Sequence, residues 1–323
     1  MNNFYVPGIK DIAMTETILA FNKILKAHPE FFYDDIQLGG MFGAIPSSIW
    51  DGGRTIMTSY YWHKQDILRF YRTIKEVNLP LRFTFTNSQL TERQLYDNYC
   101  NLQLEWAAEE DIDLSIIINS DLLYNYLKKE YPNFKYILST TSGERDVNKI
   151  NKACEEYSMV VINYNDNKNM SFLEQLTHPE KIEILVNETC APNCPYRAKH
   201  YQTISQDNAC YDIIAPTSEF GNLFDPIYRD SNLPHCSNRD SIASDFYGLL
   251  QRNAANNPTV EELYQIYPPL GIHNFKIAGR DISSLYLIES IVYYMAKPLY
   301  RDSLRFKLLN IYERNKEAIN GIY

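Results

Sequence analysis

The sequence has no run of apolar residues long enough to cross a bilayer, which takes about 18 in succession. The amino terminus, MNNFYVPGIKDIAM, lacks the basic start and the unbroken apolar stretch of a secretory signal. No segment combines low hydrophobicity with high charge, so the composition is not that of a disordered chain. We therefore expect a globular, cytoplasmic protein without a membrane partner.

Basic residues are fewer than acidic ones: 31 Lys and Arg against 40 Asp and Glu give a formal net charge of −9. Nonspecific nucleic-acid binding depends on clustered Lys and Arg that neutralise phosphates, and this balance argues against such a surface. A local basic patch is the alternative, and its nearest candidates are Arg197, Lys199, Lys276 and Arg280.

Several catalytic and nucleotide-binding motifs are also absent. The segment Val6-Pro7-Gly8-Ile9 is not the G-x-G-x-x-G turn of a dinucleotide-binding sheet, and no Walker A sequence occurs. Neither the H-E-x-x-H motif of zinc metalloproteases nor the G-x-S-x-G motif of serine hydrolases is present, so the sequence gives little support to a protease.

Short runs of β-branched and aromatic residues are present instead, and they alternate with longer stretches of helical period. This alternation predicts parallel strands that are covered by helices. Hydrophobic residues make up 45% of the chain, enough for an extensive core. The eight predicted strands are residues 4–7, 35–39, 82–86, 114–119, 136–139, 159–163, 182–187 and 274–277.

The stretches between these strands carry apolar residues at helical spacing. Side chains that can accept hydrogen bonds from free amide groups precede or open three of them, namely Thr91, Ser120 and Asp146. The predicted helices are residues 15–26, 64–77, 92–109, 120–129, 147–157 and 170–176.

Eight βα units predict an α/β fold, a TIM-like (β/α)8 barrel with a complete, an incomplete or a distorted first strand. We expect one barrel domain over residues 1–323, with 281–323 forming C-terminal helices. Residues 188–273 are a long insertion after the seventh strand, on the side where barrel enzymes place their chemistry, and we predict that it binds metal. An open doubly wound sheet is the rival architecture.

Six cysteines in a reducing compartment indicate metal ligands or redox thiols rather than disulfides. Four lie in the insertion: Cys190, Cys194, Cys210 and Cys236. Thiolates are soft donors that suit zinc or an iron-sulfur centre, and one close pair with two distant single cysteines favours the cluster over zinc. His235 is an alternative ligand, whereas Cys100 and Cys154 fall in helical stretches and are expected to pack in the core.

Two segments resemble the collagenase-like peptidase U32 family and its relatives in oxygen-independent ubiquinone hydroxylation. The first is the strand that runs into Asn187-Glu188 and Cys190-x3-Cys194, and the second is Phe275-Lys276-Ile277-Ala278-Gly279-Arg280, which is similar to a K-I-E-G-R motif. Ala278 stands where that family commonly has an acidic residue.

The resemblance implies a four-iron four-sulfur cluster on Cys190, Cys194, Cys210 and Cys236. It also implies that Glu188, Lys276 and Arg280 lie near the barrel mouth, where Glu188 would act as an acid or base and the two cations would hold an anionic group or tune the cluster. The alternative is that these three form ion pairs inside the barrel. Arg197, His200 and Tyr201 of the same loop are candidates for substrate binding.

Three asparagines, Asn87, Asn119 and Asn163, each close a predicted strand on the side of the expected pocket. They are candidates for hydrogen bonding to a small polar substrate or a nucleobase. The alternative is turn chemistry in the βα connection.

The function that these observations favour is an iron-sulfur enzyme for oxygen-independent modification, of the hydroxylation type, of an RNA base or a small organic substrate. An electron donor or partner protein is part of this hypothesis. A U32-type protease is one alternative. The other is a noncatalytic protein that binds an iron-sulfur cluster or zinc, as a structural or redox-sensing element.

Overall fold

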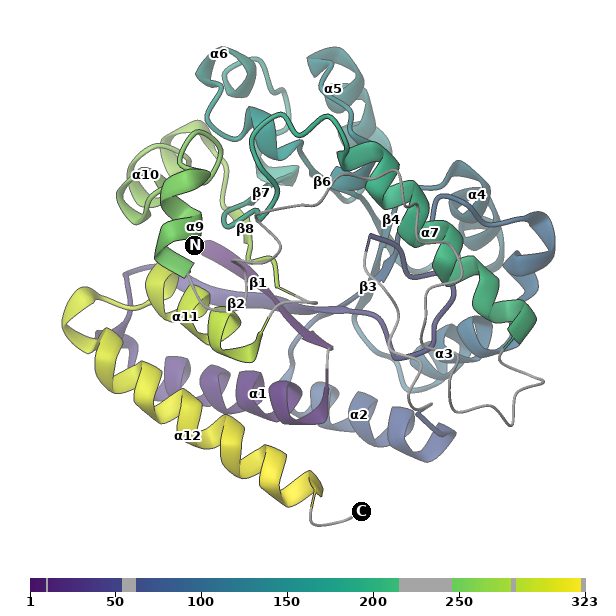
Figure 1. The fold of residues 1–323 in the computed structure, drawn as a ribbon, viewed down its shortest axis with the longest axis horizontal. Helices are drawn as coiled ribbons and strands as arrows, with labels where there is room; N and C mark the ends of the chain where they lie inside the picture. The colour runs from purple at the N-terminus through teal and green to yellow at the C-terminus, as the bar shows by residue number, and fades with distance from the viewer. Residues whose placement is uncertain (10, 54–61, 215–245, 280–282, 321–323) are drawn as a thin grey trace. The chain divides into compact units, whose positions relative to one another are not determined.

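The structure is a computed structural model that describes residues 1–323 except 10, 54–61, 215–245, 280–282 and 321–323. Eight strands form a closed barrel in which each strand neighbours the next in chain order (Figure 1). The pairs β1–β2, β3–β4, β4–β5, β6–β7, β7–β8 and β8–β1 are parallel. The chain is therefore a TIM-type (β/α)8 barrel, and the rival open sheet is wrong.

Each of the eight predicted segments overlaps one strand of the barrel. Most predicted strands extend one or two residues too far at the carboxyl end, where the chain turns into the connection. The strands are β1 Asn2–Ile9, β2 Ile36–Gly43, β3 Leu81–Phe85, β4 Leu114–Ile118, β5 Lys135–Leu138, β6 Met159–Val161, β7 Ile182–Leu185 and β8 Asn274–Lys276.

The first strand is complete, since β1 has eight residues. Its pairing with β2 shifts register between Phe4 and Tyr5 and again between Pro7 and Ile9. A side chain at Gly39 of β2 would lie 2.7 Å from the Tyr5 ring, so glycine is required where the two strands approach. The expected distortion is thus found in the register rather than in the length of the strand.

Helices follow the strands and cover the barrel (Figure 1). The α-helices are α1 Ile12–Ala27, α2 Lys64–Val77, α3 Asn98–Glu109, α4 Asp121–Glu130, α5 Val147–Glu156, α6 Met170–Leu173, α7 Arg197–Ile214, α9 Phe246–Arg252, α10 Val260–Gln265, α11 Ser284–Met295 and α12 Arg301–Asn320. Short 3-10 helices are η1 Pro29–Phe31, η2 Glu92–Tyr96, η3 Thr140–Ser142, η4 Tyr164–Asp166, η5 Pro179–Lys181, η7 Pro268–Leu270 and η8 Pro298–Tyr300.

The predicted caps are confirmed. Ser120 and Asp146 accept hydrogen bonds from the first turns of α4 and α5, and Thr91 forms a capping box with Gln94 at η2. The single helix predicted for 92–109 is wrong, because Asp97 accepts a hydrogen bond from the Cys100 N–H at 2.7 Å and begins a second helix there.

The chain divides into two compact units. The first consists of residues 1–43, 144–193 and 236–323, and the second of 44–143 and 194–235. In the first unit Phe4 and Phe275 of neighbouring strands pack together at 5.5 Å, and Tyr267 covers Phe275 from the helical layer at 5.8 Å. Side chains alternate along a strand, so Tyr5 and Lys276 point into the barrel.

In the second unit the same alternation runs along β3. Phe83 packs against Tyr71 of α2, whereas Arg82 and Thr84 on the other face of the strand are buried as well. Thr84 donates a hydrogen bond to Asp51 Oδ1 at 3.0 Å. The inner face of β3 is therefore polar, as is the inner face of β8.

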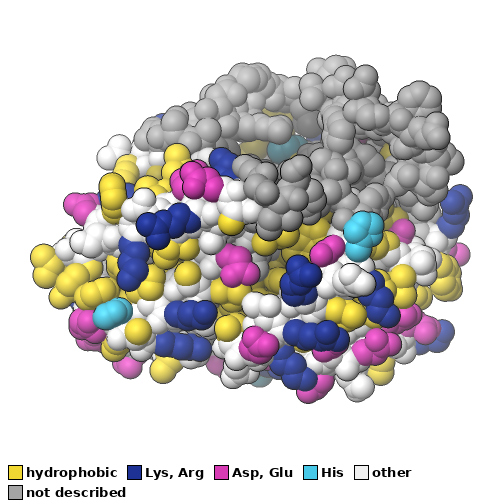
Figure 2. Space-filling view, turned by 90° about the horizontal axis from the view of Figure 1, so that it is seen from below, with side chains coloured by type: hydrophobic (Ala, Val, Ile, Leu, Met, Phe, Trp, Pro, Cys, Tyr) yellow, Lys and Arg dark blue, Asp and Glu magenta, His cyan; other side chains and the backbone are white. Residues whose placement is uncertain are grey.

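The outer surface carries both signs of charge. On the face that Figure 2 shows, Lys and Arg side chains lie interspersed with Asp and Glu side chains. In the part of the chain that the structure describes, no helix has the length and apolar character that a membrane span requires.

Candidate functional site

The carboxyl end of β7 is joined to that of β8 by the side chain of Asn187. Its Oδ1 accepts a hydrogen bond from the Ala278 N–H at 2.6 Å, and its Nδ2 donates to the Ala278 carbonyl oxygen at 3.1 Å. Nδ2 also donates to Ser290 Oγ of α11 at 3.1 Å. Asn187 is fully buried, so its amide continues the pairing of the two strands beyond their last backbone hydrogen bonds.

Glu188 follows directly and is also buried. Its Oε1 accepts hydrogen bonds from the N–H groups of Thr189 at 2.8 Å and Cys190 at 2.9 Å. Its carbonyl oxygen accepts from the side chains of Asn253 and Asn257, in the connection between α9 and α10. This oxygen therefore helps to shape the turn that carries Cys190, and the predicted acid or base role of Glu188 remains a prediction.

The turn from Cys190 to Cys194 is fixed by two further polar side chains. The Tyr164 hydroxyl donates to the Ala191 carbonyl oxygen at 2.9 Å, and Asn165 Oδ1 accepts from the Asn193 N–H at 2.8 Å. Asn193 adopts a left-handed conformation with φ of 51°, which asparagine tolerates better than most residues. The close cysteine pair thus belongs to a defined turn.

Cys210 lies in α7, which is attached to other parts of the second unit. Asn87 Nδ2 donates to the Ser205 carbonyl oxygen, and Gln94 Nε2 donates to that of Ala209 at 2.6 Å. Burial raises the pKa of the Cys210 thiol, and the charge of Asp207 raises it further. The thiol is therefore protonated near neutral pH, and a metal ion would have to displace that proton.

The described residues contain no group of three or more His, Cys, Asp and Glu side chains arranged to hold a metal ion. Cys236 and His235 lie outside the described residues, so the predicted set of four ligands remains a prediction. Cys100 and Cys154 are buried in α3 and α5, which confirms their predicted packing role. Burial raises the pKa of Cys154 to about 11.

Lys276 is paired with Glu183 inside the first unit. Its Nζ lies 3.3 Å from Glu183 Oε1, a distance typical of an ion pair, although the two groups do not have hydrogen-bond geometry. The same ammonium lies 3.8 Å from the centre of the Phe42 ring. Glu183 is completely buried and Lys276 nearly so. This arrangement favours the ion-pair alternative for Lys276, while Arg280 lies outside the described residues.

Arg197, His200 and Tyr201 lie in the first turns of α7. The Arg197 guanidinium stacks over the Tyr201 ring at 4.9 Å, and the His200 and Tyr201 rings are nearly parallel at 6.5 Å. Arg197 and Tyr201 are one helical turn apart, which explains the stacking. These three side chains form one cluster, and their predicted role in substrate binding remains a prediction.

The three strand-end asparagines have different surroundings. Asn87 is buried, donates to the Ile49 carbonyl oxygen at 2.8 Å and accepts from the Gln89 N–H at 2.9 Å. Asn163 caps η4 by accepting from the Asn165 N–H at 3.0 Å. Asn119 is half-buried after β4. For Asn87 and Asn163 the geometry is that of turn chemistry, the alternative to a polar pocket.

Tyr286 of α11 lies near Glu188, and no motif in the sequence marks it as a site residue. Its side chain is buried, and its hydroxyl lies near the Asn187 amide without hydrogen-bond geometry to any described residue. Burial raises the pKa of Tyr286, and the negative charge of Glu188 adds to that effect. Helical spacing predicts only that Tyr286 faces the core.

Comparisons with known proteins give one similar structure, the U32 peptidase Mk0906. The similarity covers 88% of this chain and 94% of that chain, with a TM-score of 0.47 and 12% sequence identity. No protein-family model matches the sequence, and no curated protein matches it. We therefore take the fold from the strand pairing and the function from the site.

Proposed function

We propose that the chain is a U32-like iron-sulfur enzyme whose Cys190, Cys194, Cys210 and Cys236 bind a four-iron four-sulfur cluster. The proposed reaction is an oxygen-independent, hydroxylation-type modification of a small organic substrate or an RNA base. The observation that carries the proposal is the defined turn from Cys190 to Cys194, which follows a barrel strand. The soft thiol donors fit iron, and a bound cluster would supply electron transfer.

Other side chains of the site hold the backbone of this turn in place. Glu188 Oε1 holds the N–H groups of Thr189 and Cys190, while Asn253 and Asn257 hold the Glu188 backbone. Buried side chains that fix the backbone of a ligand loop limit the entropy lost when the ligands bind. Glu188 is therefore proposed as a positioning residue for Cys190, as well as an acid or base candidate.

Anaerobic purification of the full chain tests the proposal. We expect a brown protein with about four iron atoms and four sulfides per chain, since that is the composition of the cluster. Serine in place of Cys190, Cys194, Cys210 or Cys236 should remove most of the iron, because each variant lacks one thiolate ligand. Iron and sulfide analysis and the visible absorbance spectrum measure this loss.

Cys100→Ala and Cys154→Ala are the matched controls, because both cysteines are buried in helices and neither is a proposed ligand. Both should retain the iron content of the unchanged chain. Circular dichroism establishes that each variant is folded before its iron is counted. Stoichiometric zinc in a colourless protein, or unchanged iron in the four serine variants, would contradict the proposed cluster.

A further inference from the structure

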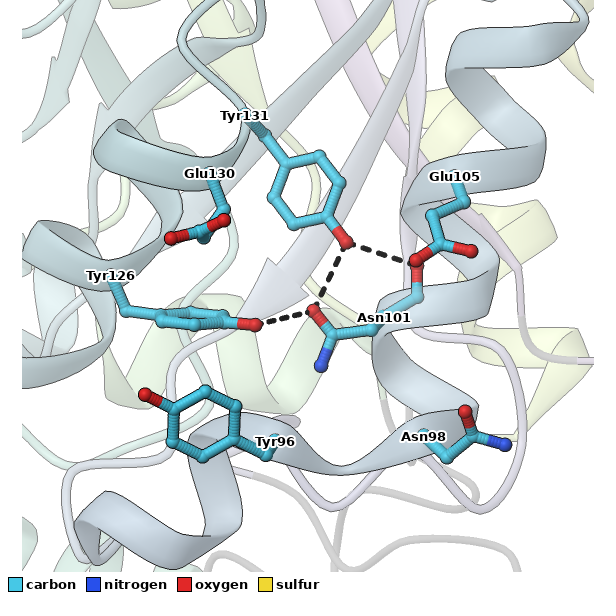
Figure 3. Close-up of a pocket in the computed structure, with 7 residues that line it drawn as sticks. All are labelled: Tyr96, Asn98, Asn101, Glu105, Tyr126, Glu130 and Tyr131. Atoms are coloured by element: carbon cyan, nitrogen blue, oxygen red, sulfur yellow. Dashed lines mark hydrogen bonds between the residues drawn. The ribbon is translucent and has the colours of Figure 1, made fainter.

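A pocket of about 390 Å³ lies in the second unit, beside η2, α3 and α4 (Figure 3). It is separate in sequence from the cysteine turn, and none of the predicted site residues lines it. Its described lining has two carboxylates, three phenols and two amides, and no Lys, Arg or His: Tyr96, Asn98, Asn101, Glu105, Tyr126, Glu130 and Tyr131.

Asn101 organises the hydrogen bonds of this pocket. Its Oδ1 accepts from the Tyr126 hydroxyl at 2.9 Å and from the Tyr131 hydroxyl at 3.0 Å, as the dashed lines of Figure 3 show. Its Nδ2 donates to the carbonyl oxygens of Leu95 and Asp97. The donors of these three side chains are used within the protein, and the phenol oxygens retain their capacity to accept.

The charge around the pocket is negative. Glu105 comes from α3 and Glu130 from α4, on different sides of the two phenols (Figure 3). Burial is the largest cause of the raised pKa of Tyr126 and Tyr131, and the charges of both glutamates contribute in the same direction. The electrostatic potential that disfavours a phenolate favours a bound cation.

One lysine interacts with this charge. Lys129 Nζ lies 3.0 Å from Glu130 Oε1, but its side chain is 81% exposed and that of Glu130 is 44% exposed. An ion pair between two exposed side chains is weak, since water and salt screen it. A cation that enters the pocket can therefore share or replace this contact, and Glu105 supplies the second carboxylate.

The arrangement of the tyrosine rings indicates what shape of ligand fits the pocket. Tyr96 and Tyr126 meet edge to face, with ring centres 5.5 Å apart and planes at 74°. Trp50 packs against Tyr126 at 6.1 Å, and Phe134 stacks on Tyr131 at 6.0 Å, so neighbouring rings support both phenols. Two rings near a right angle contact a compact, rounded head group more fully than a flat one, and aromatic faces attract cations.

We propose that this pocket binds a small organic ammonium ion whose positive charge is spread over methyl groups, as in choline. The two carboxylates supply long-range attraction, and the tyrosine rings provide contact with the methyl groups. A compact metal ion is less suitable, because it requires several oxygen ligands close together, whereas the two carboxylates come from different helices and lie on different sides of the two phenols. The site is independent of the proposed iron-sulfur function.

Calorimetric titration of the full chain with choline tests this proposal. The control ligand is the uncharged isostere of choline in which carbon replaces nitrogen, because it has the same shape without the charge. We expect choline to bind at least about tenfold more tightly than the isostere, since the cation gains both the carboxylates and the aromatic rings. Equal affinities, or no detectable binding of choline, would overturn the proposal.

Variants assign the binding to the pocket. Glu105→Gln with Glu130→Gln should weaken choline binding about fivefold, and Tyr96→Ala about threefold, without affecting the isostere to the same extent. Tyr96 is 72% exposed, so its loss should leave the fold intact. The control is Glu109→Gln, an exposed glutamate of α3 outside the pocket lining. An equal loss of choline affinity in the Glu109 variant would refute a specific binding site.

Discussion

Lys276→Met is expected to lower the free energy of unfolding by about 3 kcal/mol. The substitution removes the ammonium group that lies 3.3 Å from Glu183, and Glu183 is completely buried. Methionine has nearly the volume of lysine, so the effect arises from the loss of the positive charge that faces the buried carboxylate rather than from a cavity. Urea unfolding followed by far-ultraviolet circular dichroism measures the change.

Lys135→Met on β5 is the matched control. Lys135 forms an ion pair with Asp113 at a similar distance, 3.2 Å, but both side chains are more than half exposed. Its loss should change stability by less than about 0.5 kcal/mol, because water screens an exposed pair. The double variant Glu183→Leu and Lys276→Met should recover part of the loss of the single variant, since no charge of the pair remains.

A Lys276→Met protein as stable as the Lys135→Met protein would show that the buried pair does not contribute to the barrel. Purely additive effects in the double variant would show that the two charges are not coupled. Either result would favour a role for Lys276 other than the ion pair with Glu183.

The barrel was predictable because its signals are local. Residues 114–118 form an almost continuous apolar run, Ser120 caps the following helix, and the same sequence of signals recurs at Asp146. The break at Asp97 was not predicted, because the apolar spacing continues across residues 92–109. An aspartate inside an apolar pattern looks the same in the sequence whether its side chain faces solvent or caps the start of a new helix.

The site was less predictable, because its contacts join distant segments. Glu183 lies within the apolar strand β7, and nothing near it in the sequence indicates that its partner is Lys276. The pocket beside η2, α3 and α4 is similar, since Asn101 and Tyr131 are 30 residues apart and meet only through the packing of α3 and α4. The sequence shows that tyrosine is abundant, but it does not show that Tyr126 and Tyr131 both bond to the side-chain amide of Asn101.

Asn187→Ala is the second variant with a large expected effect, a loss of about 3 kcal/mol in the free energy of unfolding. Alanine at position 187 removes the side-chain amide that forms hydrogen bonds with both the N–H and the carbonyl group of Ala278. Ala278 is buried. Each buried polar group that loses its partner costs about 1–3 kcal/mol. Chemical unfolding compared with the unchanged chain gives the value.

Asn187→Asp separates the two hydrogen bonds. The carboxylate retains an acceptor for the Ala278 N–H but faces the Ala278 carbonyl oxygen without a donor, and burial penalises its charge. The variant should therefore be destabilised at neutral pH. It should recover as the pH falls and the carboxylate takes up a proton, since burial favours the neutral form. Stability that is independent of pH would contradict this reading of the geometry.

Asn119→Ala is the control for both Asn187 variants, because Asn119 also follows a barrel strand but is only half-buried. We expect its effect to stay within about 0.5 kcal/mol. A loss near 3 kcal/mol in the Asn119 variant would mean that any strand-end asparagine stabilises the barrel to this extent. A large loss confined to Asn187 would instead identify the join between β7 and β8 as the support on which Glu188 and the cysteine turn are built.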